Sequence, residues 1–195
     1  MAHILDYRLE HNIDGWTPSG GAVASTNLRI HGSSDVGFKW SSNQPGGYIE
    51  TTFSSAAGTN VQVNAILGVT GLTSQSATYN FKMEVFDAAA NLLANKTGSI
   101  DNKWYGHQGS NQTLGNFSQH FDFTSPEDNA GPFTYRITET GRNGVQGNHD
   151  FAVHSAWVYG YPLTPNYVVS GTSGDDIIDT GYTDDPEGDK VDNND

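Results

Sequence analysis

The stretch YNFKMEVFD, residues 79–87, decides the fold class because its side chains alternate in character. The residues at positions 79, 81, 83 and 85 are apolar or aromatic, whereas Asn80, Lys82 and Glu84 are polar. A period of two is typical of a β-strand with one buried face. The segment VFDAAANLLANKTGSI, residues 85–100, continues this strand into a hairpin that turns near 88–91 and returns over about 92–99.

The same alternation recurs along most of the chain. Clusters of Gly, Asn, Pro and Ser separate the candidate strands. Besides the hairpin they are 3–10, 22–30, 36–40, 48–53, 61–69, 117–123, 133–140 and 151–161. Roughly ten short antiparallel strands in one domain predict an all-β fold, a two-sheet β-sandwich of the jelly-roll kind.

Composition sets limits on the class of protein. The 195 residues suffice for one buried domain with an appendage. The net charge of −13 argues against nucleic acid or an anionic membrane as partner. There is no cysteine, so no disulfide forms, and no apolar run is long enough to insert into a membrane. The first residues show neither the basic nor the apolar region of a classical signal peptide.

The negative charge is concentrated at the C-terminal end. Residues 171–195 contain nine carboxylates and one cation, Lys190, which is −8 of the −13. The segment PLTPNY, residues 162–167, precedes them, and its two prolines suit an extended connection. The chain is therefore expected to comprise a sandwich at 1–162, a linker at 163–170 and a separate acidic segment at 171–195.

The acidic segment carries a repeat-like pattern. GTSGDDIID, residues 171–179, fits the nonapeptide G-G-x-G-x-D-x-U-x except for Thr172, and EGDKVD, residues 187–192, repeats part of it. The segment resembles an incomplete RTX, or hemolysin-type, calcium β-roll. The resemblance implies Ca²⁺ held between glycine turns and carboxylates, and export by a type I secretion system as part of a longer extracellular protein. The implied metal-site residues are Gly171, Gly174, Asp176, Asp179, Asp189 and Asp192. The alternative is a solvated acidic end.

The sandwich itself has a pattern that resembles the jelly rolls of carbohydrate-binding modules and galactose-binding-like domains. Its first strand ends in Glu10, followed by Gly15 and Trp16, and HDFAVHSAWVYG, residues 149–160, enters the last strand. This resemblance implies a non-catalytic module that binds a polysaccharide. It also implies a second Ca²⁺ site that joins the first and last strands through Glu10 and Asp150.

A long loop offers the candidate sugar site. Residues 98–118, GSIDNKWYGHQGSNQTLGNFS, exceed an ordinary hairpin connection, and long loops are often functional. Aromatic rings beside amides suit a sugar, since the ring stacks on its C–H face while amides meet its hydroxyls. The candidate residues are Trp104, Tyr105, His107, Gln108 and Asn111. The alternative is that Trp104 packs onto the sandwich.

Three other tryptophans are interpreted as packing residues. Trp157 lies in a strongly apolar strand and is expected in the core. For Trp16 and Trp40 the alternatives are lining the rim of the sandwich and packing, and packing is expected. The seven histidines show no zinc-like spacing, and His120 and His154 are expected as solvent-facing or hydrogen-bonded strand residues.

Two further function classes stay open. One is a structural or adhesive sandwich without a sugar site. The other is a jelly-roll lyase or hydrolase, for which the available carboxylates are Glu50, Glu84, Glu139 and Asp150. No G-x-S-x-G nucleophile motif and no phosphate-binding loop is present, so a non-catalytic module is favoured while an enzyme stays open.

Overall fold

The computed structural model describes residues 2–5, 15–30, 33–40, 46–70, 78–101, 114–144 and 150–160. Within these ranges every regular element is a β-strand, and no helix long and apolar enough to span a membrane is found among them. The strands are β1 (Ala2–Leu5), β2 (Thr17–Ser19), β3 (Ala22–Ile30), β4 (Ser33–Trp40), β5 (Tyr48–Phe53), β6 (Asn60–Thr70), β7 (Thr78–Phe86), β8 (Leu92–Asp101), β9 (Leu114–Thr124), β10 (Phe133–Asn143) and β11 (Asp150–Gly160).

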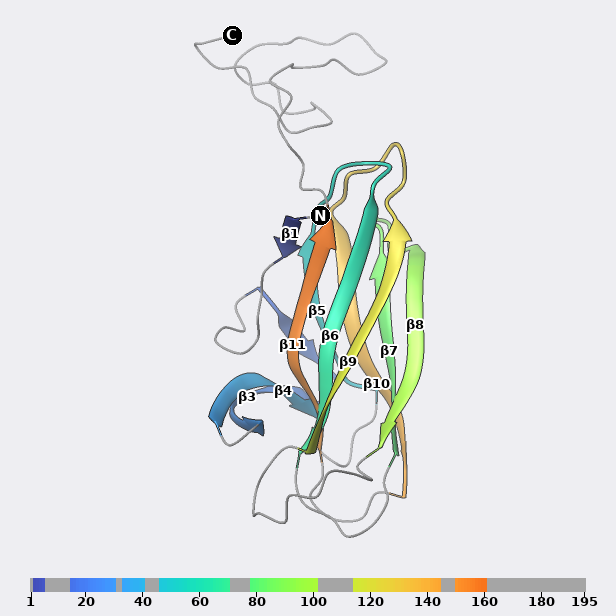
Figure 1. Ribbon diagram of the computed structural model, residues 1–195. Coiled ribbons are helices and arrows are strands. Elements are labelled where there is room, and N and C mark those ends of the chain that lie inside the picture. The colour runs from blue at the N-terminus through green and yellow to red at the C-terminus, as the bar shows by residue number, and fades with distance from the viewer. Residues whose placement is uncertain are drawn as a thin grey trace, which may run out of the picture.

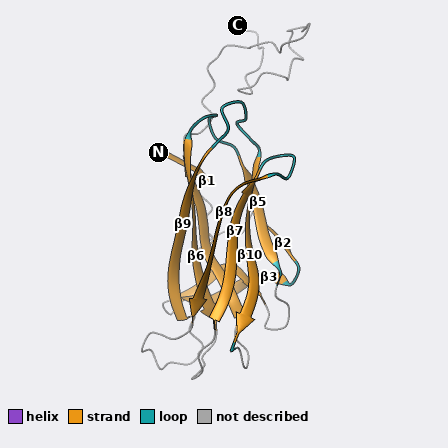
Figure 2. Cartoon of the chain, turned by 90° about the vertical axis from the view of Figure 1, so that its right-hand side faces the viewer, coloured by secondary structure: helices purple, strands orange, loops and turns teal. Residues whose placement is uncertain are grey.

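The strands form two antiparallel sheets that face each other (Figures 1 and 2). Sheet A has the order β3-β4-β11-β6-β9, and β1 also pairs with β11. Sheet B has the order β2-β5-β10-β7-β8. The prediction of an all-β, two-sheet jelly-roll sandwich is therefore confirmed. β11 is central to sheet A: β6 pairs along most of one edge, while β4 and β1 share the other edge at its two ends.

The hairpin predicted at residues 79–99 is present as β7 and β8. Its turn is closed by Asp87, whose side chain accepts hydrogen bonds from the main-chain N–H of Asn91 at 2.7 Å and from its amide at 2.8 Å. These bonds hold the pKa of the Asp87 carboxyl below its ordinary value. The short strand β2 was not predicted, because three residues are too few to show alternation.

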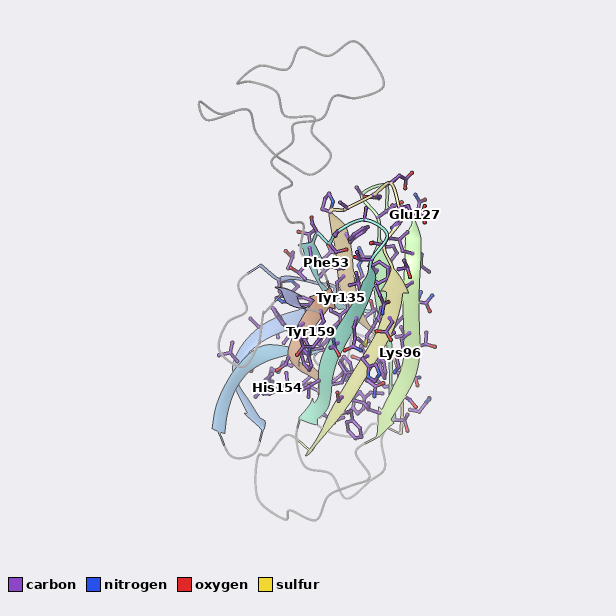
Figure 3. The ribbon with its side chains drawn as sticks, turned by 45° about the horizontal axis from the view of Figure 1, so that its top comes forward. Phe53, Lys96, Glu127, Tyr135, His154 and Tyr159 are labelled. Atoms are coloured by element: carbon purple, nitrogen blue, oxygen red, sulfur yellow. The ribbon has the colours of Figure 1, made fainter. Side chains whose placement is uncertain are left out.

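Aromatic side chains fill the space between the sheets (Figure 3). Trp16 meets Tyr135 edge-on at 5.5 Å between ring centroids, and Trp40 meets Phe151 at 5.0 Å. Such edge-to-face pairs are favoured by the ring quadrupoles and add to the stability gained from apolar burial. Both tryptophans are buried, so the expectation that they pack is confirmed.

One end of the sandwich is closed by described loops. The hydroxyl of Ser125 donates to the main-chain oxygen of Ala56 at 2.8 Å and accepts from the N–H of Thr59 at 3.0 Å. These bonds join the loops at 54–59 and 125–132. The strand ends at Trp40, Thr70 and Asn143 lie at the opposite end of the sandwich (Figure 1).

Candidate functional site

Two aromatic residues of β11 lie on the outer face of sheet A. A register shift between Val153 and Ser155 changes the alternation, so that Val158 faces the core while Trp157 and Tyr159 face outward. The expectation that Trp157 belongs to the core is therefore wrong. The reason is that β11 is apolar on both faces, so composition alone does not show which side chains point inward.

The rings of Trp157 and Tyr159 form a corner. Their centroids are 6.5 Å apart and their planes are inclined by 84°. Both side chains are half-buried. Within the described part of the chain, the indole N–H of Trp157 is buried and has no hydrogen-bond partner. Few native buried polar groups are left unpaired, so one on an outer face calls for an explanation.

Polar side chains accompany the two rings across the sheet. In the strand register Tyr159 lies opposite Gln62 of β6, which lies opposite Asp122 of β9. One step along, Trp157 lies opposite Asn64, which lies opposite His120. Gln62 is half-exposed, while His120 and Asp122 are exposed. We call the following set the outer-face site: Trp157, Tyr159, Gln62, His120 and Asp122.

Asn64 supports this site from within the sheet. Its side chain is buried, and its amide nitrogen donates to the main-chain oxygen of Gln62 at 3.3 Å. No described strand crosses in front of β6 and β9, whose outer face looks toward the viewer in Figure 1. The outer-face site is thus a sheet surface that combines two aromatic rings of β11 with polar side chains of β6 and β9.

Toward the other end of β11, one residue of β3 packs against the strand. Leu28 of β3 forms a small apolar cluster with Ala152, and both are fully buried. Gly37 of β4 makes this possible, since a Cβ there would come within 2.4 Å of Leu28 Cδ1. Next to this cluster the ring nitrogen Nδ1 of His154 lies 3.1 Å from the hydroxyl of Ser155. His154 is thus a hydrogen-bonded strand residue, as expected, and His120 is solvent-facing.

The outer face of sheet B is different because its charges are paired with one another. Arg136 donates from Nε and Nη2 to one oxygen of Glu50, at 2.9 and 2.7 Å, and its guanidinium lies 4.3 Å from the ring centre of Tyr48 and 5.0 Å from that of Phe86. On the other side of Arg136 in the register, Glu84 pairs with a lysine two residues earlier at 2.6 Å. These groups satisfy one another, so this face offers fewer open partners than sheet A.

A charged pair is buried at the end of the sandwich where β10 ends. Arg142 binds both oxygens of Glu139, with 2.6 Å between Nη2 and Oε2, and also donates to the main-chain oxygen of Trp40 at 3.0 Å. Burial raises the pKa of Glu139, opposed by the bond to Arg142. Burial likewise raises the pKa of Tyr79 to about 12, and its hydroxyl has no partner among the described residues.

Most of the site residues predicted from sequence lie outside the described residues. This holds for the loop residues Trp104, Tyr105, His107, Gln108 and Asn111, for the tail residues Gly171, Gly174, Asp176, Asp179, Asp189 and Asp192, and for Glu10. The domain boundaries at 162 and 170 fall outside as well.

Asp150 is the one predicted metal ligand that the structure describes. It opens β11, as expected, and its carboxylate lies 3.5 Å from the ammonium of Lys39. A bound cation would compete with this lysine. The described residues contain no group of three His, Cys, Asp or Glu side chains suited to a metal ion. Glu10 lies outside the described residues, so a Ca²⁺ site formed by Glu10 and Asp150 stays a prediction.

The carboxylates considered for a hydrolase all have cationic partners. Glu50 pairs with Arg136, Glu84 with Lys82, Glu139 with Arg142 and Asp150 with Lys39. Glu50 and Glu84 lie on the outer face of sheet B, whereas Glu139 is buried inside.

Comparisons with known proteins give similarity of fold. No protein-family profile matches the chain, and no curated protein matches it. Similar solved structures include an arabinose-bound α-L-arabinofuranosidase (11% identity, 82% of this chain, 26% of that chain, TM-score 0.49). They also include a family 16 carbohydrate-binding module (14% identity, 80% of this chain, 98% of that chain, TM-score 0.45). A third is a family 35 carbohydrate-binding module from Clostridium thermocellum (16% identity, 76% of this chain, 95% of that chain, TM-score 0.43).

The class that the two antiparallel sheets define is a β-sandwich of the jelly-roll kind. The chain spans about a quarter of the arabinofuranosidase, which has further parts that this chain does not match.

Proposed function

We propose that the protein is a non-catalytic module that binds a polysaccharide through the outer-face site. The observation that supports this most is the pair of outward aromatic rings on β11, Trp157 and Tyr159, beside polar side chains of two neighbouring strands. A pyranose has an apolar C–H face and a rim of hydroxyls. It therefore fits a surface that combines rings with amide, imidazole and carboxylate groups.

The rigid sheet is well suited to this task. Side chains on paired strands keep fixed spacings, so little conformational entropy is lost when a ligand binds. The indole N–H of Trp157 has no partner in the described chain, and a ligand hydroxyl that reached it after a small side-chain rotation would satisfy it. On the outer face of sheet B, by contrast, the charged groups bind one another.

The test is a comparison of matched variants. Trp157→Ala and Tyr159→Ala are expected to lose binding to a panel of soluble polysaccharides in affinity electrophoresis, with an unchanged circular dichroism spectrum. Tyr48→Ala, which removes a half-buried tyrosine from the outer face of sheet B, is the control and should bind as the wild type does. If the wild type binds no glycan, the alternative of a structural or adhesive sandwich is favoured.

The loop residues Trp104 and Tyr105 offer a second sugar site that the same experiment distinguishes. Trp104→Ala should leave binding unchanged if the outer-face site is responsible. Loss of binding in Trp104→Ala alone would place the site in the loop and contradict the assignment to sheet A.

We also propose that residues 171–195 form the first coil of a calcium-binding β-roll and that the protein acts outside the cell. The support is the spacing of glycine, aspartate and isoleucine in residues 171–179 and the charge of −8 over the segment. Calorimetry with Ca²⁺ should show binding that is lost in Asp176→Ala and Asp179→Ala. Unchanged Ca²⁺ binding in both variants would contradict the proposal.

A further inference from the structure

The geometry of the outer-face site points to a narrower class of ligand: we infer that it takes a single, uncharged polysaccharide chain, and neither a crystalline polysaccharide surface nor a polyuronate. This inference rests on the proposed function and deepens it. Two independent observations carry it, namely the angle between the aromatic rings and the charges on the strands that form the face.

The ring angle excludes a flat ligand. A crystalline polysaccharide presents many pyranose rings in one plane, and binding to it needs aromatic rings that are coplanar and project from the protein. Trp157 and Tyr159 are inclined by 84°, so only one of them can lie flat against any plane. Both are also half-buried and do not stand clear of the sheet.

The same corner suits an isolated chain. One ring can stack on the face of a sugar while the other contacts the edge of that sugar or of the next unit, which a twisted chain turns out of the first plane. Gln62 and Asp122 lie in line with Tyr159 across the sheet, where they can meet hydroxyls beside the stacked ring. A separate chain exposes such hydroxyls on all sides, whereas chains in a crystal bond them to each other.

The charges exclude a polyanion. The sequences of β6, β9 and β11 contain no Lys or Arg, and Asp122 places an exposed carboxylate on the face. Two cationic side chains of the described residues lie near the outer face of sheet A. Lys39 is paired with Asp150 at the far end of β11, and Lys96 reaches over from β8 to the main-chain oxygen of His120 at 2.9 Å (Figure 3). Neither provides the cluster of cations that a polyuronate needs beside the exposed carboxylate of Asp122.

The experiment uses the full chain against three kinds of probe. Soluble xylan, mixed-linkage glucan, galactan and galactomannan represent neutral chains; polygalacturonate and alginate represent polyuronates; microcrystalline cellulose and chitin represent surfaces. Affinity electrophoresis at low salt measures the first two, and depletion of protein from the supernatant measures the third. Trp157→Ala, Tyr159→Ala and the control Tyr48→Ala are carried through every assay.

The expected result is binding to at least one neutral soluble polysaccharide. It should weaken at least about tenfold in Trp157→Ala and Tyr159→Ala and remain unchanged in Tyr48→Ala. The polyuronates and crystalline polymers should not bind. Binding to either of these that depends on Trp157 would overturn the inference while leaving the proposed function intact. Binding to none of the probes would overturn the proposed function and the inference with it.

Discussion

The hydroxyl of Tyr135 in sheet B donates a hydrogen bond of 3.2 Å to the main-chain oxygen of Asn64 in sheet A. Tyr135 is fully buried, and burial raises its pKa well above the ordinary value, so the phenol stays protonated as a donor. Because Asn64 lies opposite Trp157 in the register, this bond ties the floor of the outer-face site to the second sheet.

Removing the Tyr135 hydroxyl should destabilise the protein. Tyr135→Phe leaves a buried carbonyl without this partner and is expected to lower the free energy of unfolding by about 1 kcal/mol. Tyr79→Phe is the matched control, because the Tyr79 hydroxyl has no partner among the described residues, so its loss should be neutral or slightly stabilising. Urea denaturation measures both variants. A Tyr79→Phe change as costly as Tyr135→Phe would contradict this account of the hydrogen bond.

The buried carboxylate of Glu139 should make stability depend on pH. Its pKa is raised in the folded state, so the folded protein holds this proton at pH values where the unfolded chain has released it. The bound proton stabilises the folded state fully below about pH 4.5, the ordinary pKa of a glutamate. This contribution is lost as the pH rises through the higher pKa that Glu139 has in the folded protein. The charged groups around Glu139 are Arg142, Asp150 and the Lys39 that pairs with Asp150, whereas Tyr79, with a pKa of about 12, stays neutral in this range.

Glu139→Gln isolates this effect. The difference in unfolding free energy, wild type minus variant, should decrease between pH 5 and pH 8, because only the wild type has a proton to lose at this position. Urea denaturation of both proteins at several pH values measures this difference in unfolding free energy. A difference that grows with pH would mean that Arg142 lowers the pKa of Glu139 more than burial raises it.

The close approach of β3 to β11 predicts a sensitive glycine. A Cβ at Gly37 would lie 2.4 Å from Leu28 Cδ1 and 2.5 Å from the main-chain oxygen of Val153, so neither the side chain nor the backbone can avoid it cheaply. Gly37→Ala is expected to cost about 1–3 kcal/mol of stability. Gly141→Ala is the control, since its nearest neighbour would be at an ordinary 3.6 Å. Equal melting temperatures for the two variants would argue against the close packing.

The sequence allowed the strands to be predicted but not the site. Strict alternation, as in residues 79–87, reports a buried face directly, and the observed limits of β7 differ from the prediction by one residue at each end. In β11 the alternation failed, because apolar residues occupy both faces and a register shift lies near His154. For this reason the sequence did not show that Trp157 points outward.

The residues of the outer-face site could not be predicted from the sequence for a second reason. Its residues come from three strands that are far apart in the chain, and they meet only through the register: Gln62 is in β6, His120 and Asp122 are in β9, and Tyr159 is in β11. No local pattern in a sequence fixes which residue of one strand lies opposite which residue of another. The loop was predicted over 98–118, but 98–101 belong to β8 and 114–118 to β9. Its aromatic and amide residues stand close together in the chain, so their combination is visible in the sequence alone.

The most direct measurement of the central claim is a ¹H–¹⁵N NMR titration that follows the indole N–H signals of the four tryptophans, assigned by single Trp→Phe variants. Trp16 and Trp40 are buried between the sheets and serve as internal references. With a saturating soluble neutral oligosaccharide, we predict that the Trp157 signal moves while the signals of Trp16, Trp40 and Trp104 stay in place. A shift confined to Trp104, with Trp157 unmoved, would contradict binding at the outer face of sheet A.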